Sequence, residues 1–211
     1  MIDRAVLDRI IAVAEPGARF PRDTVDALAR AGFLSLGGDA ATEVVERLGA
    51  ACPATAAVLR SHYAAVALIG AHAGPWLQGE IAAGRHLSTL ALSDDPGEPS
   101  RSVESGGVVR LTGRKLDVVA AGEADSYVWS ARGADGEPGL WLVPAQARGL
   151  LVPAVPDGTG PAGCAGSSVR ADPVLLPASV SLRAVVAGKD LPRFSRGHHH
   201  RYAGPAQPSR A

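Results

Sequence analysis

An apolar run that ends in Leu90-Ala91-Leu92-Ser93 is followed by Leu111-Thr112-Gly113-Arg114-Lys115, then by Ala124-Asp125-Ser126-Tyr127-Val128 and Gly139-Leu140-Trp141-Leu142-Val143. These runs are short, apolar or alternating, and Gly, Pro or Asp residues separate them. Strands at such regular spacing are typical of a closed or nearly closed antiparallel β-barrel. The pattern predicts strands at residues 87–93, 107–112, 115–119, 126–132, 140–144, 150–154, 167–171 and 174–176.

The residues before about position 85 have a different sequence pattern, because their apolar side chains recur at helical spacing. The first apolar stripe starts at Ile2, and a second helix is expected between Pro21, which suits a first helical turn, and Gly32, which suits a helix end. Further helices are predicted at residues 42–50, 53–71 and 75–83. The helix at 53–71 is apolar almost all round, which favours its burial between neighbours.

We therefore expect an α+β chain in three parts. Residues 1–85 form an N-terminal helical domain, and residues 86–182 form a middle antiparallel β-barrel domain. From about Gly188 the sequence has no periodic apolar face and becomes rich in Pro and Arg. Residues 183–211 are accordingly predicted to be a truncated or disordered tail.

Composition limits the possible partners. The chain has 211 residues, with 21 Lys or Arg and 21 Asp or Glu, so its formal net charge is zero. A nucleic acid or an anionic membrane favours a basic surface, and neither partner is predicted. The N-terminus mixes charges into its apolar positions, unlike a secretory signal, and no apolar run reaches the length of a membrane span. We expect a cytoplasmic protein, with Cys52 and Cys164 as buried or incidental thiols that form neither a disulfide nor a zinc site.

The serial order of these elements resembles the acyl-CoA dehydrogenase family over about residues 1–185. Phe20-Pro21 and the Leu28-to-Gly32 segment are similar to an early helix of that family. The segment Val44-Val45-Glu46-Arg47-Leu48-Gly49 and His62 resemble the helices that form one wall of its acyl pocket. The 111–115 run, with Ala124-Asp125 after it, resembles the middle domain.

The resemblance implies FAD as cofactor and an acyl-CoA thioester as substrate. In the family a carboxylate removes the α-proton while the β-hydride passes to the flavin, and hydrogen bonds to the thioester carbonyl stabilise the enolate-like charge. The family's base is a glutamate of a C-terminal helical domain, and we expect no counterpart of that domain after Val180. No catalytic residue is therefore assigned, and whether the chain is itself an enzyme stays open.

The resemblance also points to a first flavin edge at residues 92–100. The family has Leu-Thr-Glu-Pro followed by Gly-Ser-Asp there, with backbone groups and the threonine hydroxyl meeting the pyrimidine ring. Here Leu92 contributes its backbone, Ser93 replaces the threonine, and Ser100 is a shifted counterpart of the family serine. An acidic, proline-rich surface turn explains the same run equally well.

A second flavin edge is implied after Lys115, where the family has a tryptophan, an aliphatic residue and a threonine or serine. This chain has Asp117, Val118 and Val119. Val119 lacks the hydroxyl, and Asp117 places a carboxylate where an aromatic wall is expected, so only backbone amides remain as flavin donors. The alternative interpretation is a barrel strand with Val118 facing the core.

Other motifs have structural interpretations. Gly163-Cys164-Ala165-Gly166-Ser167-Ser168 aligns with a family turn and is expected to be a glycine-rich barrel turn. His198-His199-His200 is expected to bind metals only non-specifically, so no metal site is predicted. Trp129 and Trp141 are expected in the core, where each buries roughly 200 Å². Trp76 is expected to pack the helical domain onto the barrel.

Three functional hypotheses follow. In the first, the chain is part of a larger FAD-dependent enzyme that oxidises an acyl-CoA, and it is inactive alone. In the second, it is a non-catalytic partner subunit of a true acyl-CoA dehydrogenase, which the absent flavin side chains favour. In the third, it is a truncated gene product, which the abrupt change of sequence pattern at about Ala187 favours. The first two predict a homo-oligomer or a hetero-oligomer with a related subunit.

Overall fold

The computed structural model describes residues 2–14, 17, 19–70, 72 and 74–182, and the predicted tail lies outside them. The helices come first: α1 (Arg4–Val13), α2 (Arg22–Arg30), the 3₁₀ turn η1 (Phe33–Ser35), α3 (Gly38–Ala51), α4 (Pro53–Ile69) and α5 (Pro75–Ala82). Local sequence explains where they begin. The Asp3 side chain caps α1 by accepting a hydrogen bond from the Val6 amide, and Pro53 occupies the first turn of α4.

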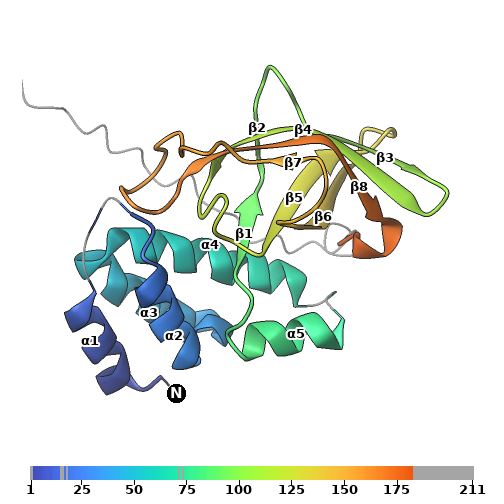
Figure 1. Cartoon of the computed structure of the whole chain (residues 1–211). Helices are drawn as coiled ribbons and strands as arrows, with labels where there is room; N and C mark the ends of the chain where they lie inside the picture. Colours follow the sequence, from blue (N-terminus) through green and yellow to red (C-terminus); the bar gives the residue numbers. More distant parts are fainter. Residues whose placement is uncertain (1, 15–16, 18, 71, 73, 183–211) are drawn as a thin grey trace, which may run out of the picture.

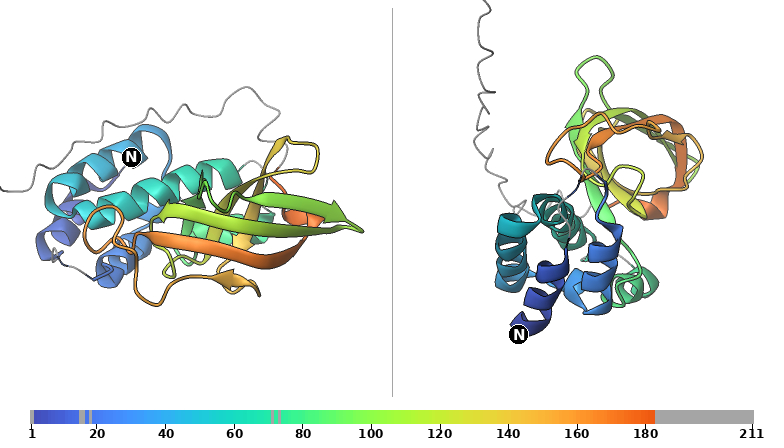
Figure 2. Two further views of the ribbon diagram at one scale, coloured as in Figure 1. Left: turned by 90° about the horizontal axis from the view of Figure 1, so that it is seen from above. Right: turned by 60° about the vertical axis from the view of Figure 1, so that its left-hand side comes forward.

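The strands follow the helices: β1 (Ser88–Ala91), β2 (Ser93–Asp94), β3 (Arg101–Ser105), β4 (Val108–Val118), β5 (Ser126–Arg132), β6 (Pro138–Pro144), β7 (Leu150–Leu151) and β8 (Ser167–Pro177), then the 3₁₀ turn η2 (Ala178–Val180). They form one eight-stranded sheet in the order β1-β5-β3-β4-β8-β7, with β2 beside β4 and β6 beside β5. The sheet is strongly curled, and β1 rises into it from the helical layer (Figures 1 and 2).

The expectation of a purely antiparallel barrel is wrong, because the sheet is mixed. β1 runs parallel to β5, with Ser88 opposite Ser126, and β3 is also parallel to β5. The pairs of β4 with β2, β3 and β8 are antiparallel, as are β5 with β6 and β7 with β8. Since β1 enters from the helices rather than from a hairpin, no tight turn forces it to run against its neighbour.

Two pairs of predicted strands are single long strands. β4 continues through Gly113, which has a φ of 117° and lies at a register shift against β8, so this glycine marks an irregularity in a strand rather than a turn. β8 likewise joins the two segments predicted at 167–171 and 174–176. The pattern does not predict β3, because Val103 is its one apolar residue.

α4 connects the helical core to the sheet. Ten of its residues are buried, as its apolar sequence predicts, and Ala65, Leu68 and Ile69 share a cluster with Val128 and Leu140 of the sheet. The core positions predicted for Trp129 and Trp141 are confirmed. Trp76 does not pack the layers together: it is 73% exposed, because α5 turns Leu77 and Ile81 inward instead.

Candidate functional site

A cavity of about 410 Å³ lies where α4 meets the first strands of the sheet. Its wall includes Leu92 and Ser93, at the junction of β1 and β2, and Val119, just after β4. The other described residues that line it are Ala57, Arg60, Ser61 and Ala64 of α4, with Leu90, Leu116, Asp117, Gly160 and Pro161. The structure thus brings three of the five flavin residues expected from the sequence to one cavity.

Unpaired backbone donors occur on this wall. Leu92 follows β1 and Val119 follows β4, and neither amide donates a hydrogen bond to another described residue. Ser93 adds an exposed hydroxyl beside them. Amides and a hydroxyl suit the carbonyl oxygens and ring nitrogens of a planar heterocycle, and the volume is within the range of about 300–1,000 Å³ found for small-molecule pockets. These groups fit the pyrimidine edge of a flavin.

A chain of hydrogen bonds holds this wall against α4. The Leu90 amide donates to Ser61 Oγ at 3.1 Å, Ser61 Oγ and Thr89 Oγ1 lie 2.8 Å apart, and Thr89 Oγ1 donates to the Val119 carbonyl at 2.7 Å. Because the one Thr89 hydroxyl proton goes to Val119, Ser61 is the donor to Thr89. The relay therefore ties α4, β1 and the end of β4 together at the cavity, which Ser61 and Val119 line.

Asp117 brings a carboxylate to the cavity where the resemblance implies an aromatic wall. Its side chain is exposed, and its φ of 56° places it in the left-handed region, which Asp tolerates better than most residues. It lies within a register shift of β4 against β8, between Lys115 and Val118. In the described part of the chain no aromatic side chain lines this cavity.

Two of the expected flavin residues lie elsewhere. Ser100 is buried before β3, where its amide donates to Asp94 Oδ1 at 3.2 Å and its carbonyl accepts from the Arg132 amide at 3.1 Å. Val118 is fully buried in the sheet core opposite Ser167, in agreement with the barrel-strand interpretation. The structure does not place either side chain in the cavity lining.

Lys115 is a residue that the sequence interpretation missed. It is fully buried on β4, and its Nζ donates to Asp94 Oδ1 at 2.6 Å and to Ser130 Oγ at 2.7 Å. The same ammonium lies 3.4 Å from the Leu92 carbonyl and 5.5 Å from the Trp129 ring centroid. Lys115 therefore supports the strand junction that carries Leu92.

The pKa values of this pair are set by burial and by mutual attraction. Burial lowers the pKa of Lys115, and Asp94 partly opposes that change. Burial alone would raise the pKa of Asp94, but hydrogen bonds from Lys115 and Ser100 lower it below its usual value. The sequence does contain a signal for the burial of Lys115. This residue shares the period of two with the buried Val109 and Leu111, which places it on the inner face of β4.

The histidines of the helical layer are structural. His62 Nε2 lies 2.9 Å from the Leu34 carbonyl, and its Nδ1 accepts from the Ser88 amide at 3.0 Å. Burial lowers the pKa of His62 to about 4, so it stays neutral. His86 Nε2 lies 2.9 Å from Ser126 Oγ, but Ser126 is buried and cannot meet a substrate. His86 therefore does not activate Ser126 as a nucleophile.

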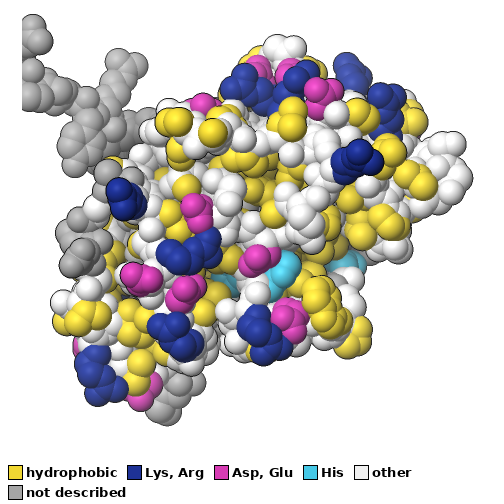
Figure 3. Space-filling model, in the orientation of Figure 1, with side chains coloured by type: hydrophobic (Ala, Val, Ile, Leu, Met, Phe, Trp, Pro, Cys, Tyr) yellow, Lys and Arg dark blue, Asp and Glu magenta, His cyan; other side chains and the backbone are white. Residues whose placement is uncertain are grey.

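Other classes of site find little support. Cys52 and Cys164 are free and buried, as expected, and burial raises the pKa of both thiols. In the described ranges no three metal-binding side chains gather, and His198-His199-His200 lies outside those ranges. None of the described helices combines the length and the apolarity that crossing a bilayer requires. Acidic and basic side chains are interspersed over the visible face (Figure 3).

Solved structures match this chain, whereas no protein-family model and no curated protein sequence does. KijD3 in complex with FMN and dTDP-3-amino-2,3,6-trideoxy-4-keto-3-methyl-D-glucose matches with a TM-score of 0.71 and 22% identity, over 84% of this chain and 51% of that chain. Glutaryl-CoA dehydrogenase from Mycobacterium smegmatis with FADH2 matches with a TM-score of 0.72 and 17% identity, over 85% and 54%. TdsC from Paenibacillus sp. A11-2 with FMN and indole matches with a TM-score of 0.73 and 17% identity, over 85% and 51%.

These neighbours are flavin-dependent enzymes of the acyl-CoA dehydrogenase fold, and the chain spans about half of their length. At these identities the likeness concerns the fold. It agrees with the order of elements from which the family resemblance was drawn. The chain therefore has an acyl-CoA dehydrogenase-like fold.

Proposed function

We propose that this chain forms one wall of a flavin site in a larger flavin-dependent oxidoreductase that oxidises an acyl-CoA thioester, and that the chain alone is inactive. The observation that carries the proposal is the grouping of Leu92, Ser93 and Val119 around one cavity with two unpaired amides. The neighbours solved with FMN or FADH2 support a flavin over other heterocycles.

The proposed roles follow from the donors present. The Leu92 and Val119 amides donate to the pyrimidine edge of the flavin, and the Ser93 hydroxyl donates or accepts beside them. The Ser61–Thr89 relay keeps the two edges at a constant separation. When bound, the flavin supplies an acceptor for the hydride of the acyl-CoA. We propose FAD, as the resemblance implies, and FMN is the necessary comparison because solved neighbours hold it.

The base that removes the α-proton is not assigned to this chain. Asp117 is the carboxylate in the described cavity lining, but it lies at the end of β4, two residues before Val119, one of the proposed flavin donors. We propose that the base and the opposite wall come from a further helical segment or another subunit. Such an arrangement requires an oligomer or a larger assembly for activity.

The first test is a titration of the purified chain with FAD and with FMN, followed by flavin fluorescence. Ala64 and Ala67 offer a matched pair on α4, because Ala64 lines the cavity and Ala67 is exposed. Ala64→Phe fills the cavity and should weaken flavin binding by about tenfold or more, which corresponds to about 1.4 kcal/mol. Ala67→Phe should leave it unchanged. Absence of saturable binding of either flavin to the unaltered chain contradicts the proposal.

Substrate oxidation is tested separately from binding. A flavin-loaded sample mixed anaerobically with an acyl-CoA should keep its oxidised absorbance, because the chain has no assigned base. Bleaching by the chain alone contradicts the proposed inactivity but leaves the flavin site in place.

A second candidate function is that of a non-catalytic partner subunit. It is favoured by Asp117 and Val119, which replace the side chains that the resemblance implies at the second flavin edge. This role predicts that the chain binds neither FAD nor FMN, yet forms a complex with a complete acyl-CoA dehydrogenase. Size-exclusion chromatography of the mixture, with the flavin absorbance following the larger species, distinguishes it from the first candidate.

A further inference from the structure

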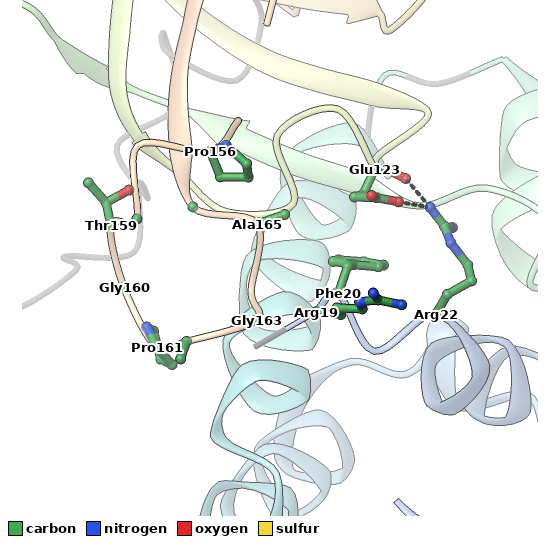
Figure 4. Close-up of a pocket in the computed structure, with 13 residues that line it drawn as sticks. Arg19, Phe20, Arg22, Glu123, Pro156, Thr159, Gly160, Pro161, Gly163 and Ala165 are labelled. Atoms are coloured by element: carbon green, nitrogen blue, oxygen red, sulfur yellow. Dashed lines mark hydrogen bonds and ion pairs between the residues drawn. The ribbon is translucent and has the colours of Figure 1, made fainter. Parts of the chain in front are cut away.

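A second cavity, of about 690 Å³, has no part in the proposed flavin wall. It shares Gly160 and Pro161 with the cavity lined by Leu92, Ser93 and Val119, which we call the flavin cavity. From these two residues it extends to Arg19, Phe20 and Arg22 at the start of α2. The loop from Pro156 to Gly166 forms one side, and Arg19, Phe20 and Arg22 form the other (Figure 4). We call it the loop cavity.

The charges of the loop cavity are unequally matched. Arg22 donates to the carboxylate of Glu123 and, at 3.1 Å, to its backbone carbonyl, and its guanidinium lies 4.9 Å from the Phe20 ring centroid (Figure 4). Arg19 has no hydrogen bond or ion pair with any described residue and is exposed. Since Glu123 is the acidic residue of the described lining and Arg22 already neutralises it, Arg19 leaves one positive charge at the cavity.

The loop also presents unused backbone donors. Gly160, Ala162, Gly163 and Ala165 line the cavity, and their amides donate no hydrogen bond within the described residues. Gly160, Gly163 and Ala165 have φ values of 83°, 89° and 50°. Left-handed residues in a turn are a component of the backbone nests that collect amides around anions. Ala165 holds this conformation although a Cβ disfavours it.

We propose that the loop cavity binds a phosphate group of a phosphorylated ligand, with Arg19 and the loop amides as its donors. A guanidinium matches phosphate oxygens with two parallel hydrogen bonds, and amides complete the set without adding charge. The cavity is much larger than one phosphate, so the rest of the ligand lies beside it. Nucleotide cofactors and coenzyme A share this chemistry.

Isothermal titration with inorganic pyrophosphate tests the proposal without any flavin. Arg19→Gln removes the proposed ligand of the phosphate and should weaken binding by about tenfold or more. Arg30→Gln is the control, because Arg30 is exposed at the end of α2 and does not line the cavity. It should change the affinity less than about twofold, and raising NaCl to about 0.5 M should weaken binding to the unaltered chain.

Competition identifies the source of the phosphate. If coenzyme A displaces pyrophosphate and FMN does not, the ligand is the coenzyme A diphosphate. If FMN displaces pyrophosphate and riboflavin does not, the ligand is a nucleotide cofactor. Either result supports the loop cavity as a phosphate site. No saturable pyrophosphate binding, or equal losses in Arg19→Gln and Arg30→Gln with unchanged circular dichroism, overturns it. A failure of pyrophosphate to bind leaves the flavin proposal intact, because the flavin test measures a different ligand and Arg19 does not line the cavity of Leu92, Ser93 and Val119.

Discussion

The Nζ of Lys115 lies 2.6 Å from Asp94 Oδ1, although the lysine side chain is completely buried and the aspartate side chain is 38% exposed. The ion pair ties β4 to β2, and the same ammonium reaches Ser130 on β5 and the Leu92 carbonyl. A buried charge without a partner is expensive, so this junction depends on both residues. The proposed flavin wall therefore rests on a buried ion.

Removing the Asp94 carboxylate alone should destabilise the fold more than removing the charges of both Asp94 and Lys115. Asp94→Asn leaves the ammonium buried without a counter-charge, and we expect a loss of about 3 kcal/mol in the free energy of unfolding. Lys115→Met combined with Asp94→Asn should recover a large part of that loss, because no buried charge remains. Urea unfolding measures both, with exposed Glu46→Gln as a control that changes stability by less than about 0.5 kcal/mol. Equal stability of Asp94→Asn and the unaltered chain contradicts this account.

Val118 and Val119 are neighbours with opposite surroundings, so the same substitution should have different effects. Val118→Thr puts a hydroxyl into the sheet core and should cost about 1–3 kcal/mol. Val119→Thr adds a hydroxyl at the cavity lining, should cost less than about 1 kcal/mol, and should tighten flavin binding by about fivefold through one further hydrogen bond. Thermal unfolding and flavin titration of the two variants measure this. Tighter flavin binding in Val118→Thr would place the flavin on the wrong side of β4.

The chain should lose stability as the pH falls from about 6.5 towards 4. His62 has a pKa lowered from 6.5 to about 4 by burial, so between these values the unfolded chain binds a proton that the folded chain does not. The contribution is fully present above about pH 6.5, and roughly 2 kcal/mol of it is lost by about pH 5. Asp94, whose pKa lies below its ordinary 3.8, titrates beneath this window.

Urea unfolding at several pH values measures the slope. His62→Gln should reduce the dependence between about pH 5 and 6.5 while lowering stability overall, because the hydrogen bonds to Leu34 and Ser88 change. His72→Gln, at an exposed position, is the matched control. An unchanged slope in His62→Gln would assign the acid sensitivity to other groups.

Gly113 should tolerate no side chain, whereas Gly106 should. A Cβ at Gly113 would lie 2.5 Å from Ser100 Cα, and the φ of 117° is unfavourable for other residues. Gly113→Ala should cost about 3 kcal/mol or more from the clash and the strain together. Gly106 has a φ of 58° with nothing within 4 Å of its built Cβ, so Gly106→Ala should cost about 1 kcal/mol from strain alone. Differential scanning calorimetry of the pair tests the difference.

The candidate site was only partly predictable. The family resemblance predicts Leu92, Ser93 and Val119 as flavin contacts. The cavity brings them together because β1, β2 and the end of β4 converge on α4. Ser100 and Val118 were expected there too, but the turn after β2 and the alternation of β4 direct them elsewhere. Arg60 and Ala64 were not expected, since nothing local shows which face of an apolar helix meets a distant strand.

The sequence by itself determined where most of the helices and strands lie, because burial follows local periodicity: Ser126–Arg132 is a strand with the expected bounds, and the apolar helix from Pro53 is the buried α4. Only the tertiary structure decided which strands pair, in which direction, and what they enclose. Parallel pairing of β1 with β5, the burial of Lys115 against Asp94 and both cavities depend on contacts between segments far apart in the chain. Such contacts leave no trace in local spacing, because they are settled by the packing of whole elements.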